Sequence, residues 1–280
     1  MKRLGFAFNP TSETTLELRE RAMGWCQVRD IEAWASAAGD YDELIRQLPG
    51  TDALVVLGGD GTFLRAARAV AVVDVPILGV NAGKVGFLSK AEAEQLGSVL
   101  ELLKEGRYTF EPRMTLEAVV IAGAHPGRSE VRHIALNEAA VVRGAHARVV
   151  RLEVLIDGTH LASYVADGLV IASPTGSTGY SFSAGGPILD PTSRNLVVTP
   201  VAAYLSAIRS IVVSPRHAVA VRVVDAHDAL VSIDGREDFP ILVGDAVEVR
   251  PREQAIRFIE PEGAIGFWDL VRHKAELLPS

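Results

Sequence analysis

The segment "ALVVLGGDGTFLRAARAVA" (53–71) limits the possible folds of this chain more than any other stretch. It opens with a continuous apolar run, which is typical of a strand buried on both faces of a parallel sheet. Glycines around Asp60 end the predicted strand at 53–59, and residues 63–71 then space their apolar side chains at helical intervals. A buried strand, a glycine turn and a helix in this order predict one unit of an α/β sheet.

The same alternation runs through the first part of the chain. Residues 4–8 and 76–81 are short apolar runs that predict further strands, whereas 14–23 and 91–106 carry helical periodicity. We therefore expect residues 1–110 to form a doubly wound, Rossmann-like α/β domain.

The pattern changes at Met114 to closely spaced runs rich in β-branched residues. Asp157-Gly158 and Asp234-Gly235 lie between such runs, and Asp-Gly pairs favour the tight turns of β-hairpins. We therefore expect residues 111–262 to form a mainly-β domain, a β-sandwich or a related two-layer structure. Residues 263–280 return to helical spacing, and we expect this helical tail to pack back on the first domain.

Composition excludes several classes of protein. With 48% hydrophobic and 22% charged residues among 280, the chain is typical of globular proteins, and its formal net charge of −7 argues against binding to nucleic acid. No run approaches the ~20 apolar residues of a membrane helix, and no signal peptide is evident. The single cysteine, Cys26, is expected to fill the core, and the histidines show no metal-ligand spacing. We expect no nucleic-acid or membrane partner, no structural metal and a cytoplasmic location.

Asp60 supports two interpretations. In an open α/β sheet, ligands bind beyond the carboxyl ends of the strands, where glycines let phosphates approach the amides of a helix N-terminus. An aspartate there would repel an anion, so its role would be to hold a cation or to accept a proton from a hydroxyl that attacks phosphorus. Alternatively, Asp60 only caps the helix at Thr62-Phe63. This segment alone does not decide between the two.

A second distinctive segment is "DGLVIASPTGSTGYSFSAGGPILDP" (167–191), which includes a predicted strand. Between residues 173 and 192 the chain carries eight hydroxyl side chains and four glycines. Long ordered loops in compact domains are usually functional. The composition predicts a segment that wraps a ligand rich in hydroxyl and phosphate groups.

Four motifs, in this order and spacing, closely resemble the NAD kinases, which phosphorylate the 2′-hydroxyl of the adenosine ribose of NAD. They are "GGDGT" (58–62), "NAGKVGFL" (81–88), "LNEAAVVRG" (136–144) and "DGLVIASPTGSTGYSFSAGGPI" (167–188). The first motif alone is shared with lipid kinases and phosphofructokinases, whereas the four together are specific. The resemblance covers roughly residues 50 to 260.

The resemblance implies roles for individual residues. Asp60 matches the proton acceptor of the family, and Gly61 lines the dinucleotide beside it. Asn137 and Glu138 match the pair that hydrogen-bonds the nucleotide, and Asp167 matches the residue that closes over the nicotinamide end. The other NAD-binding residues that the resemblance implies are Arg65, Arg148, Thr175, Thr178, Gly179, Tyr180, Ser181, Phe182, Ser183, Ala202 and Arg236.

Several of these positions also have a structural interpretation. Arg65 fits an exposed helix arginine, Arg148 is one of three arginines in "RGAHARVVR", and Asp167 could belong to a hairpin turn. Arg236 departs from the family, because many members carry glutamine there.

The resemblance thus implies a cytoplasmic NAD kinase in which Asp60 accepts the proton of the 2′-hydroxyl. The phosphoryl donor is ATP or polyphosphate, and a divalent cation, Mg²⁺, bridges the donor phosphates. Because the family is typically homo-oligomeric, we expect a homodimer or a homotetramer. The alternatives are a lipid kinase that shares the aspartate turn and a non-catalytic NAD(P)-binding regulator.

Overall fold

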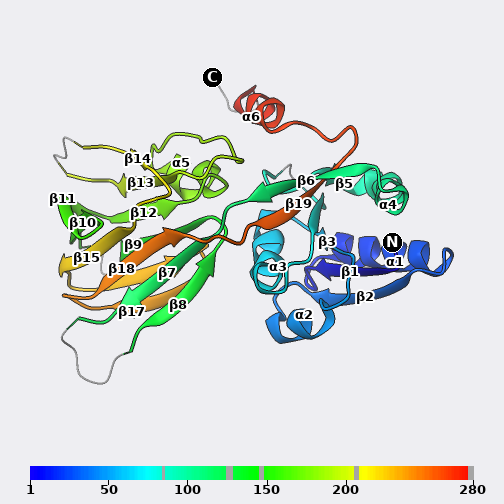
Figure 1. Cartoon of the computed structure of the whole chain (residues 1–280), viewed down its shortest axis with the longest axis horizontal. Coiled ribbons are helices and arrows are strands. Elements are labelled where there is room, and N and C mark those ends of the chain that lie inside the picture. The colour runs from blue at the N-terminus through cyan, green and yellow to red at the C-terminus, as the bar shows by residue number, and fades with distance from the viewer. Residues whose placement is uncertain (84–85, 124–128, 145–147, 205–207, 277–280) are drawn as a thin grey trace. The chain divides into compact units, whose positions relative to one another are not determined.

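The computed structural model describes residues 1–280 except 84–85, 124–128, 145–147, 205–207 and 277–280. The chain divides into two compact units, and most of their elements are labelled in Figure 1. Unit 1 comprises Met1–Pro112 and Ile256–Ser280, and unit 2 comprises Arg113–Ala255. Among the described residues, no helix has the length and hydropathy needed to span a bilayer.

Unit 1 is built around one sheet. Its elements are β1 (Arg3–Phe8), α1 (Glu13–Gln27), β2 (Glu32–Ala37), α2 (Tyr41–Gln47), β3 (Ala53–Leu57), α3 (Asp60–Val73), β4 (Ile77–Asn81), β5 (Ala91–Glu92), α4 (Leu96–Glu105), β6 (Tyr108–Arg113), β19 (Ile256–Pro261) and α6 (Phe267–Glu276). The strand order is β2-β1-β3-β4-β19-β6, with β5 beside β4. β1 pairs in parallel with β2 and β3, and β4 pairs in parallel with β3, β5 and β19.

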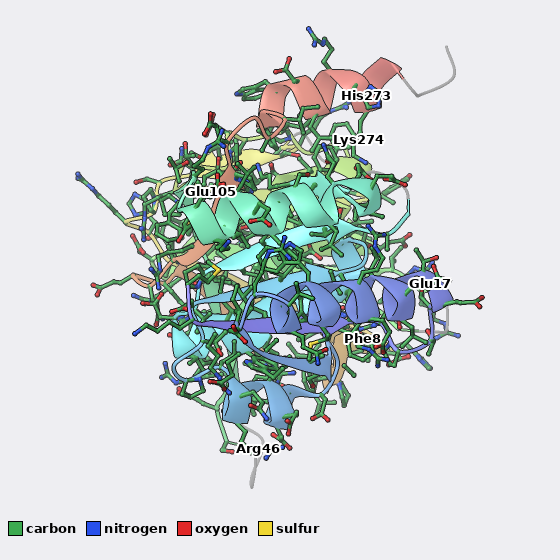
Figure 2. All side chains as sticks on the ribbon, turned by 90° about the vertical axis from the view of Figure 1, so that its right-hand side faces the viewer. Phe8, Glu17, Arg46, Glu105, His273 and Lys274 are labelled. Atoms are coloured by element: carbon green, nitrogen blue, oxygen red, sulfur yellow. The ribbon has the colours of Figure 1, made fainter. Side chains whose placement is uncertain are left out.

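Helices cover both faces of this sheet. On one face, Cys26 of α1 and Leu100 of α4 pack in a core with Val55 of β3. Figure 2 looks onto this face, with α1 and α4 in front of the strands. On the other face, the ring of Phe63 in α3 lies 4.9 Å from that of Phe258 in β19. The predicted doubly wound α/β arrangement is confirmed.

Three elements of unit 1, β2, α2 and β6, lie outside the predicted strands and helices. β2 has the sequence "EAWASA", whose small residues give a weak strand signal, and α2 is only seven residues long. The helix predicted over 91–106 begins at Leu96, because Ala91–Glu92 pairs with β4 as β5. The helix predicted over 63–71 already begins at Asp60.

Unit 2 consists almost entirely of strands. They are β7 (Leu116–Ile121), β8 (Val131–Ala135), β9 (Glu138–Arg143), β10 (Val150–Ile156), β11 (Thr159–Ala166), β12 (Gly168–Ala172), β13 (Leu196–Val201), β14 (Ile211–Val213), β15 (Val219–Asp225), β16 (Ala229–Ile233), β17 (Glu237–Ile241) and β18 (Ala246–Pro251), with one short helix, α5 (Tyr180–Ser183). They form two six-stranded sheets, with orders β11-β10-β15-β18-β7-β8 and β14-β13-β12-β9-β16-β17.

The two sheets of unit 2 share one core. Buried residues of the first sheet, such as Leu152 and Val221, form a single cluster with Val141, Ile171 and Val231 of the second. Side chains from two inner faces that interdigitate in this way define a sandwich. The predicted β-sandwich-like domain is confirmed.

Both predicted Asp-Gly hairpin turns are present in unit 2. Asp157 and Gly158 have φ values of 48° and 79° between β10 and β11, and Asp234 and Gly235 have 51° and 64° between β16 and β17. Aspartate and glycine are among the residues that tolerate this left-handed region.

The C-terminal segment belongs to unit 1. The range expected for the second domain, 111–262, includes β19, but Phe258 of β19 pairs with Ile77 of β4 in the sheet of unit 1. The following helix, α6, contacts unit 1 through Phe87, whose ring lies 6.3 Å from that of Phe267 and 4.7 Å from Lys274 Nζ. Lys274 and His273 are labelled on α6 in Figure 2.

Candidate active site

Asp60 is the first residue of α3, directly after the glycine turn that ends β3. The N-cap residue of α3 is Gly59, and the N–H groups of Thr62 and Phe63 bond to the carbonyl of Gly59 at 2.9 and 3.1 Å. The Asp60 carboxylate accepts the backbone N–H groups of Phe87 and Leu88 at 2.9 and 3.1 Å. The interpretation of Asp60 as a helix cap is therefore wrong, because its carboxylate joins the start of α3 to the segment that follows β4.

Glycines make this close approach possible. A Cβ atom at Gly86 would lie 2.0 Å from Asp60 Oδ1, and one at Gly58 would lie 2.7 Å from Thr62 Oγ1. Each Asp60 oxygen accepts one N–H group and keeps a further lone pair. Since Asp60 is partly exposed, its carboxylate can still accept a proton or a hydrogen bond from a ligand.

Gly61 and Arg65 lie further along α3. Gly61 is exposed in the first turn, where the helix dipole and the N-terminal amides favour an anion. Arg65 is exposed one turn later, and its Cδ atom lies next to Gly39. The structure thus places Arg65 on the outer surface of the helix.

In unit 2, the hydroxyl-rich segment after β12 turns many of its side chains inward. Ser173, Ser177 and Ser181 are fully buried. Ser173 Oγ donates to the carbonyl of Leu136 at 2.5 Å, Ser177 Oγ donates to a carbonyl three residues before it, and Ser181 Oγ lies 2.9 Å from Thr199 Oγ1. These hydroxyls hold the loop in place, as serine commonly does in turns.

The threonines of this segment also bond within the protein. Thr175 is buried, and its Oγ1 accepts a hydrogen bond from Arg113 Nη1 at 3.3 Å. Thr178 Oγ1 donates to the Thr175 carbonyl at 3.2 Å. Exposed Ser183 makes a longer contact, of 3.4 Å, with the carbonyl of Gly179.

Asn137 and Glu138 lie where β9 begins, next to this loop. A Cβ atom at Gly176 would lie 2.1 Å from the Asn137 carbonyl, and one at Gly179 would lie 3.5 Å from Glu138 Oε2. Asn137 Oδ1 and Glu138 Oε2 are both buried, and neither has a hydrogen-bond partner among the residues that the structure describes. Because buried polar atoms are nearly always paired, these two oxygens point to a ligand.

Asp234 holds the backbone of this pair in place, although the sequence Asp234-Gly235 predicts only a hairpin turn. Its carboxylate accepts the backbone N–H groups of Leu136, Asn137 and Glu138 at 3.0, 2.7 and 3.1 Å. Burial, together with the nearby Asp234 carboxylate, raises the pKa of Glu138 from 4.5 to about 8. Burial also raises the pKa of Asp234, while its three N–H donors and Arg236 lower it.

Asp167 and Tyr180 belong to the same cluster. Asp167 Oδ1 accepts a hydrogen bond from Arg143 Nε at 2.9 Å. Tyr180 is 41% exposed, and its pKa is raised by burial and by the carboxylates of Asp167 and Glu138, while Arg143 lowers it. Phe182, 49% exposed on the same short helix, adds a second aromatic surface. Arg143 lies within the "LNEAAVVRG" motif but was not among the expected binding residues.

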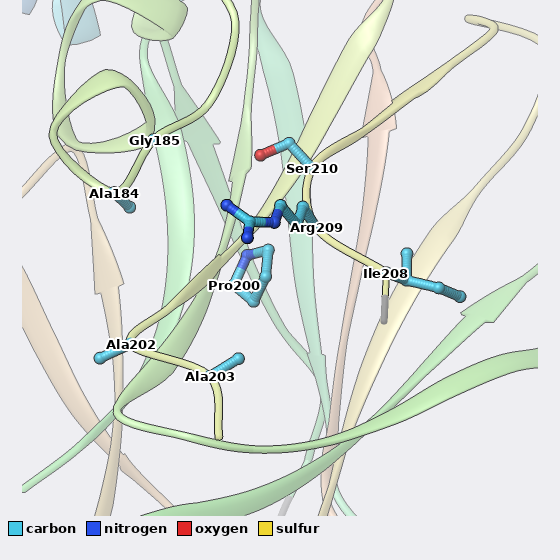
Figure 3. Close-up of a pocket in the computed structure, with 8 residues that line it drawn as sticks. All are labelled: Ala184, Gly185, Pro200, Ala202, Ala203, Ile208, Arg209 and Ser210. Carbon is cyan, nitrogen blue, oxygen red and sulfur yellow. The ribbon is translucent and has the colours of Figure 1, made fainter. Parts of the chain in front are cut away.

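The three remaining predicted residues of unit 2 lie at the edge of this cluster or outside it. Ala202, with a φ of 48°, lines a cavity of about 450 Å³ beside Pro200 and Arg209, as Figure 3 shows. The cavity also contacts the end of α5 through Ala184. Arg236 lies close enough to lower the pKa of Asp234. Arg148 is exposed before β10, and no contact of its side chain with the cluster is observed among the described residues.

Comparison with known sequences identifies both units. Residues 5–108 match the ATP-NAD kinase N-terminal domain, and residues 136–261 match the ATP-NAD kinase C-terminal domain. The NAD kinase of Gemmatimonas aurantiaca is 39% identical over 271 residues, which are 96% of this chain and 92% of the relative. The NAD kinase of Heliobacterium modesticaldum is 36% identical over 287 residues, which are 99% of both chains.

Solved structures share the fold. The crystal structure of yeast NADH kinase complexed with NADH has a TM-score of 0.84 at 22% identity and covers 99% of this chain and 87% of the other. That of an NAD kinase from Archaeoglobus fulgidus in complex with ATP has a TM-score of 0.77 at 24% identity and covers 99% and 100%. The two matched domains and the relatives of nearly full length show that this chain belongs to the NAD kinase family.

Proposed function

We infer that this chain is an NAD kinase, which phosphorylates the 2′-hydroxyl of the adenosine ribose of NAD to give NADP. The observation that carries this inference is the pair of buried oxygens, Asn137 Oδ1 and Glu138 Oε2, which find no partner within the described part of the chain. Both oxygens can accept hydrogen bonds, and the ribose hydroxyls and the adenine amino group of NAD can donate them. They lie in the domain that matches the ATP-NAD kinase C-terminal domain.

Unit 2 supplies the dinucleotide site in this proposal. Tyr180 and Phe182 offer exposed aromatic faces on which a base can stack. The ion pair between Asp167 and Arg143 places one carboxylate and one cation beside Tyr180 for the polar parts of the ligand. The buried serines of the loop keep this surface rigid rather than contacting NAD themselves.

Unit 1 supplies the base. The 2′-oxygen attacks the terminal phosphorus of the donor, the bond from that phosphorus to the bridging oxygen breaks, and the proton of the hydroxyl passes to Asp60. The N–H groups of Phe87 and Leu88 hold the Asp60 carboxylate in one orientation. With ATP as donor, ADP leaves.

The donor is ATP or polyphosphate, and it carries Mg²⁺ as part of the substrate. Mg²⁺ keeps several of its waters and is usually held by phosphates with one or two carboxylates, so it needs no cage of protein ligands. Among the residues that the structure describes, no three histidine, cysteine, aspartate or glutamate side chains group closely enough to hold a metal ion.

We propose a homodimer or a homotetramer in the cytoplasm. The edge strands β11 and β14 of the two sheets carry the exposed apolar side chains Leu161 and Val212, which supports self-association. Cys26 is fully buried, and burial raises the pKa of its thiol to about 11, so it is unreactive in a reducing compartment. Light scattering on purified protein measures the oligomeric state.

The test of the function is a turnover assay. Purified protein is incubated with NAD, Mg²⁺ and either ATP or polyphosphate, and the NADP formed is measured with an NADP-specific dehydrogenase. We expect NADP with at least one donor and none when the donor is omitted. Failure to form NADP with either donor would refute the proposal.

A further inference from the structure

Asp234 makes four hydrogen bonds to one short segment of backbone. Its carboxylate accepts three N–H groups, from Leu136, Asn137 and Glu138, and its own N–H donates to the Glu138 carbonyl at 3.0 Å. These residues are 96 to 98 positions away in the sequence. The segment lies between the end of β8 and the start of β9. The Asp234 carboxylate therefore supplies hydrogen-bond acceptors for backbone N–H groups at a place where regular strand pairing is interrupted.

Two backbone carbonyl groups of the same segment accept hydrogen bonds from Ser173. Ser173 donates its hydroxyl to the Leu136 carbonyl at 2.5 Å and its N–H to the Asn137 carbonyl at 2.8 Å. The backbone of residues 136–138 is therefore held by Asp234 and Ser173. The side-chain oxygens Asn137 Oδ1 and Glu138 Oε2, in contrast, find no hydrogen-bond partner among the described residues.

Asp234 also places a second carboxylate next to Glu138. Three N–H groups point at Asp234, so we assign the negative charge to Asp234 and the proton to Glu138. Among the residues that the structure describes, the other charged or titratable groups that act on the pair are Arg236 beside Asp234 and Tyr180 beside Glu138. Tyr180 in turn lies near the ion pair of Asp167 and Arg143.

We propose that Asp234 is a positioning residue, which orients Asn137 and Glu138 toward the dinucleotide. Burial and the neighbouring Asp234 charge favour the protonated form of Glu138 in the ligand-free protein. The identity of the ligand rests on the function proposed above. A protonated Glu138 accepts at one oxygen and donates its O–H from the other, so two ribose hydroxyls can donate to both of its oxygens only when the carboxylate is ionised. Binding of NAD therefore releases a proton, and apparent affinity falls as the pH drops below the Glu138 midpoint near 8.

The first experiment uses the ligand-free protein. The carboxyl carbon of Glu138 is titrated by ¹³C NMR and assigned by its loss in Glu138→Gln. We expect a midpoint near 8 in the wild type and a lower midpoint in Asp234→Asn, which removes the neighbouring charge. The matched control is Asp157→Asn, because Asp157 occupies the other Asp-Gly turn and its carboxylate likewise accepts a backbone N–H, from Ala218 at 2.9 Å. That control should leave the midpoint unchanged.

The second experiment measures proton release. NAD is titrated calorimetrically at pH 6.5, 7.5 and 8.5 in two buffers with different heats of ionisation. We expect the wild type and Asp157→Asn to release a proton at the lower pH values, Asp234→Asn to release less, and Glu138→Gln to release none. In turnover assays at pH 8.5, where Glu138 is mostly ionised in both proteins, Asp234→Asn should raise KM for NAD about tenfold, the effect of losing one hydrogen bond to a charged group, with little change in kcat.

The outcomes separate the two proposals. A Glu138 midpoint that is equal in the wild type and Asp234→Asn, or NAD binding without proton release, overturns the inference even if NADP is formed. If no NADP is formed, the proposed function fails, while the NMR titration still decides whether Asp234 controls the protonation of Glu138. A simple loss of folding would appear as a lost melting transition in Asp234→Asn. In that case, Asp234→Glu, which keeps the charge, should retain proton release if the inference holds.

Discussion

The Asp60→Asn variant tests whether Asp60 acts as the catalytic base or only links the start of α3 to Phe87 and Leu88. Asparagine keeps one carbonyl oxygen for the N–H of Phe87 or Leu88, but its NH₂ group faces the other N–H, which is left unpaired. Losing one hydrogen bond to a charged group costs about 1.5–3 kcal/mol. At about 2–4 °C per kcal/mol, the melting temperature should fall by several degrees if the loop unfolds with its unit.

The chain offers a matched control in Asp52→Asn. Asp52 also lies in unit 1, and its carboxylate accepts the backbone N–H groups of Lys2 and Arg3, the latter at 2.9 Å. Both N–H groups bond to one oxygen, Oδ2, whose place the amide oxygen of asparagine can take, so this substitution removes the charge with a smaller fall in melting temperature and no direct effect on chemistry. Any extra loss of turnover in Asp60→Asn then reports the missing base.

The assay is NADP formation at saturating NAD and donor, with NAD binding measured by calorimetry. Loss of general-base help typically reduces the rate by ~10²- to 10⁴-fold. We therefore expect Asp60→Asn to bind NAD but to lose at least about 100-fold in kcat, and Asp52→Asn to stay near the wild type. Comparable turnover in the two variants would show that Asp60 only ties the loop to α3, and the proposed mechanism would be wrong.

Three further predictions concern Gly86, Tyr180 and Glu138. Gly86→Ala places a Cβ atom against Asp60 Oδ1, so it should reduce kcat although every ionisable group is kept; unchanged kcat would contradict the importance of this contact. Tyr180→Ala removes an exposed aromatic face, so it should raise KM for NAD more than it lowers kcat, and steady-state kinetics would show the reverse if Tyr180 took part in proton transfer. Because the pKa of folded Glu138 is about 8, above its ordinary 4.5, the folded state binds more protons and the free energy of unfolding falls as the pH rises between these values. Glu138→Gln should lack this decline in urea unfolding at pH 5 and pH 8, and an equal decline would refute the assignment.

The strong local signals in the sequence predict the architecture well. The buried strands β3 and β4, the helix α3 and both Asp-Gly turns follow from apolar runs, helical spacing and turn chemistry. β2 and α2 escape prediction because each is short and its residues have weak preferences. Their places in unit 1 depend on neighbours that are distant in sequence, since β2 pairs with β1.

The candidate site is harder to predict from the sequence, because the direction in which each side chain points decides whether it can contact a ligand. The composition of the loop predicts that its hydroxyl side chains wrap a ligand. Ser173, Ser177 and Ser181, however, are buried and form hydrogen bonds within the protein. Asp234 reads as a turn residue, but its carboxylate bonds a segment 96 to 98 positions away. The lipid-kinase alternative, which the aspartate turn alone leaves open, is excluded by the match of both domains to the NAD kinase family.

The position of β19 has a consequence for how the chain folds during synthesis. β19 lies between β4 and β6 in the sheet of unit 1, yet it begins only at Ile256 of 280 residues. Unit 2 is a continuous segment, Arg113–Ala255, and is complete before β19 leaves the ribosome. The earlier strands of unit 1 therefore leave the ribosome first, but the position between β4 and β6 in their sheet stays open until β19 is made. Synthesis runs from the N-terminus to the C-terminus, whereas unit 1 closes only after unit 2 has been made.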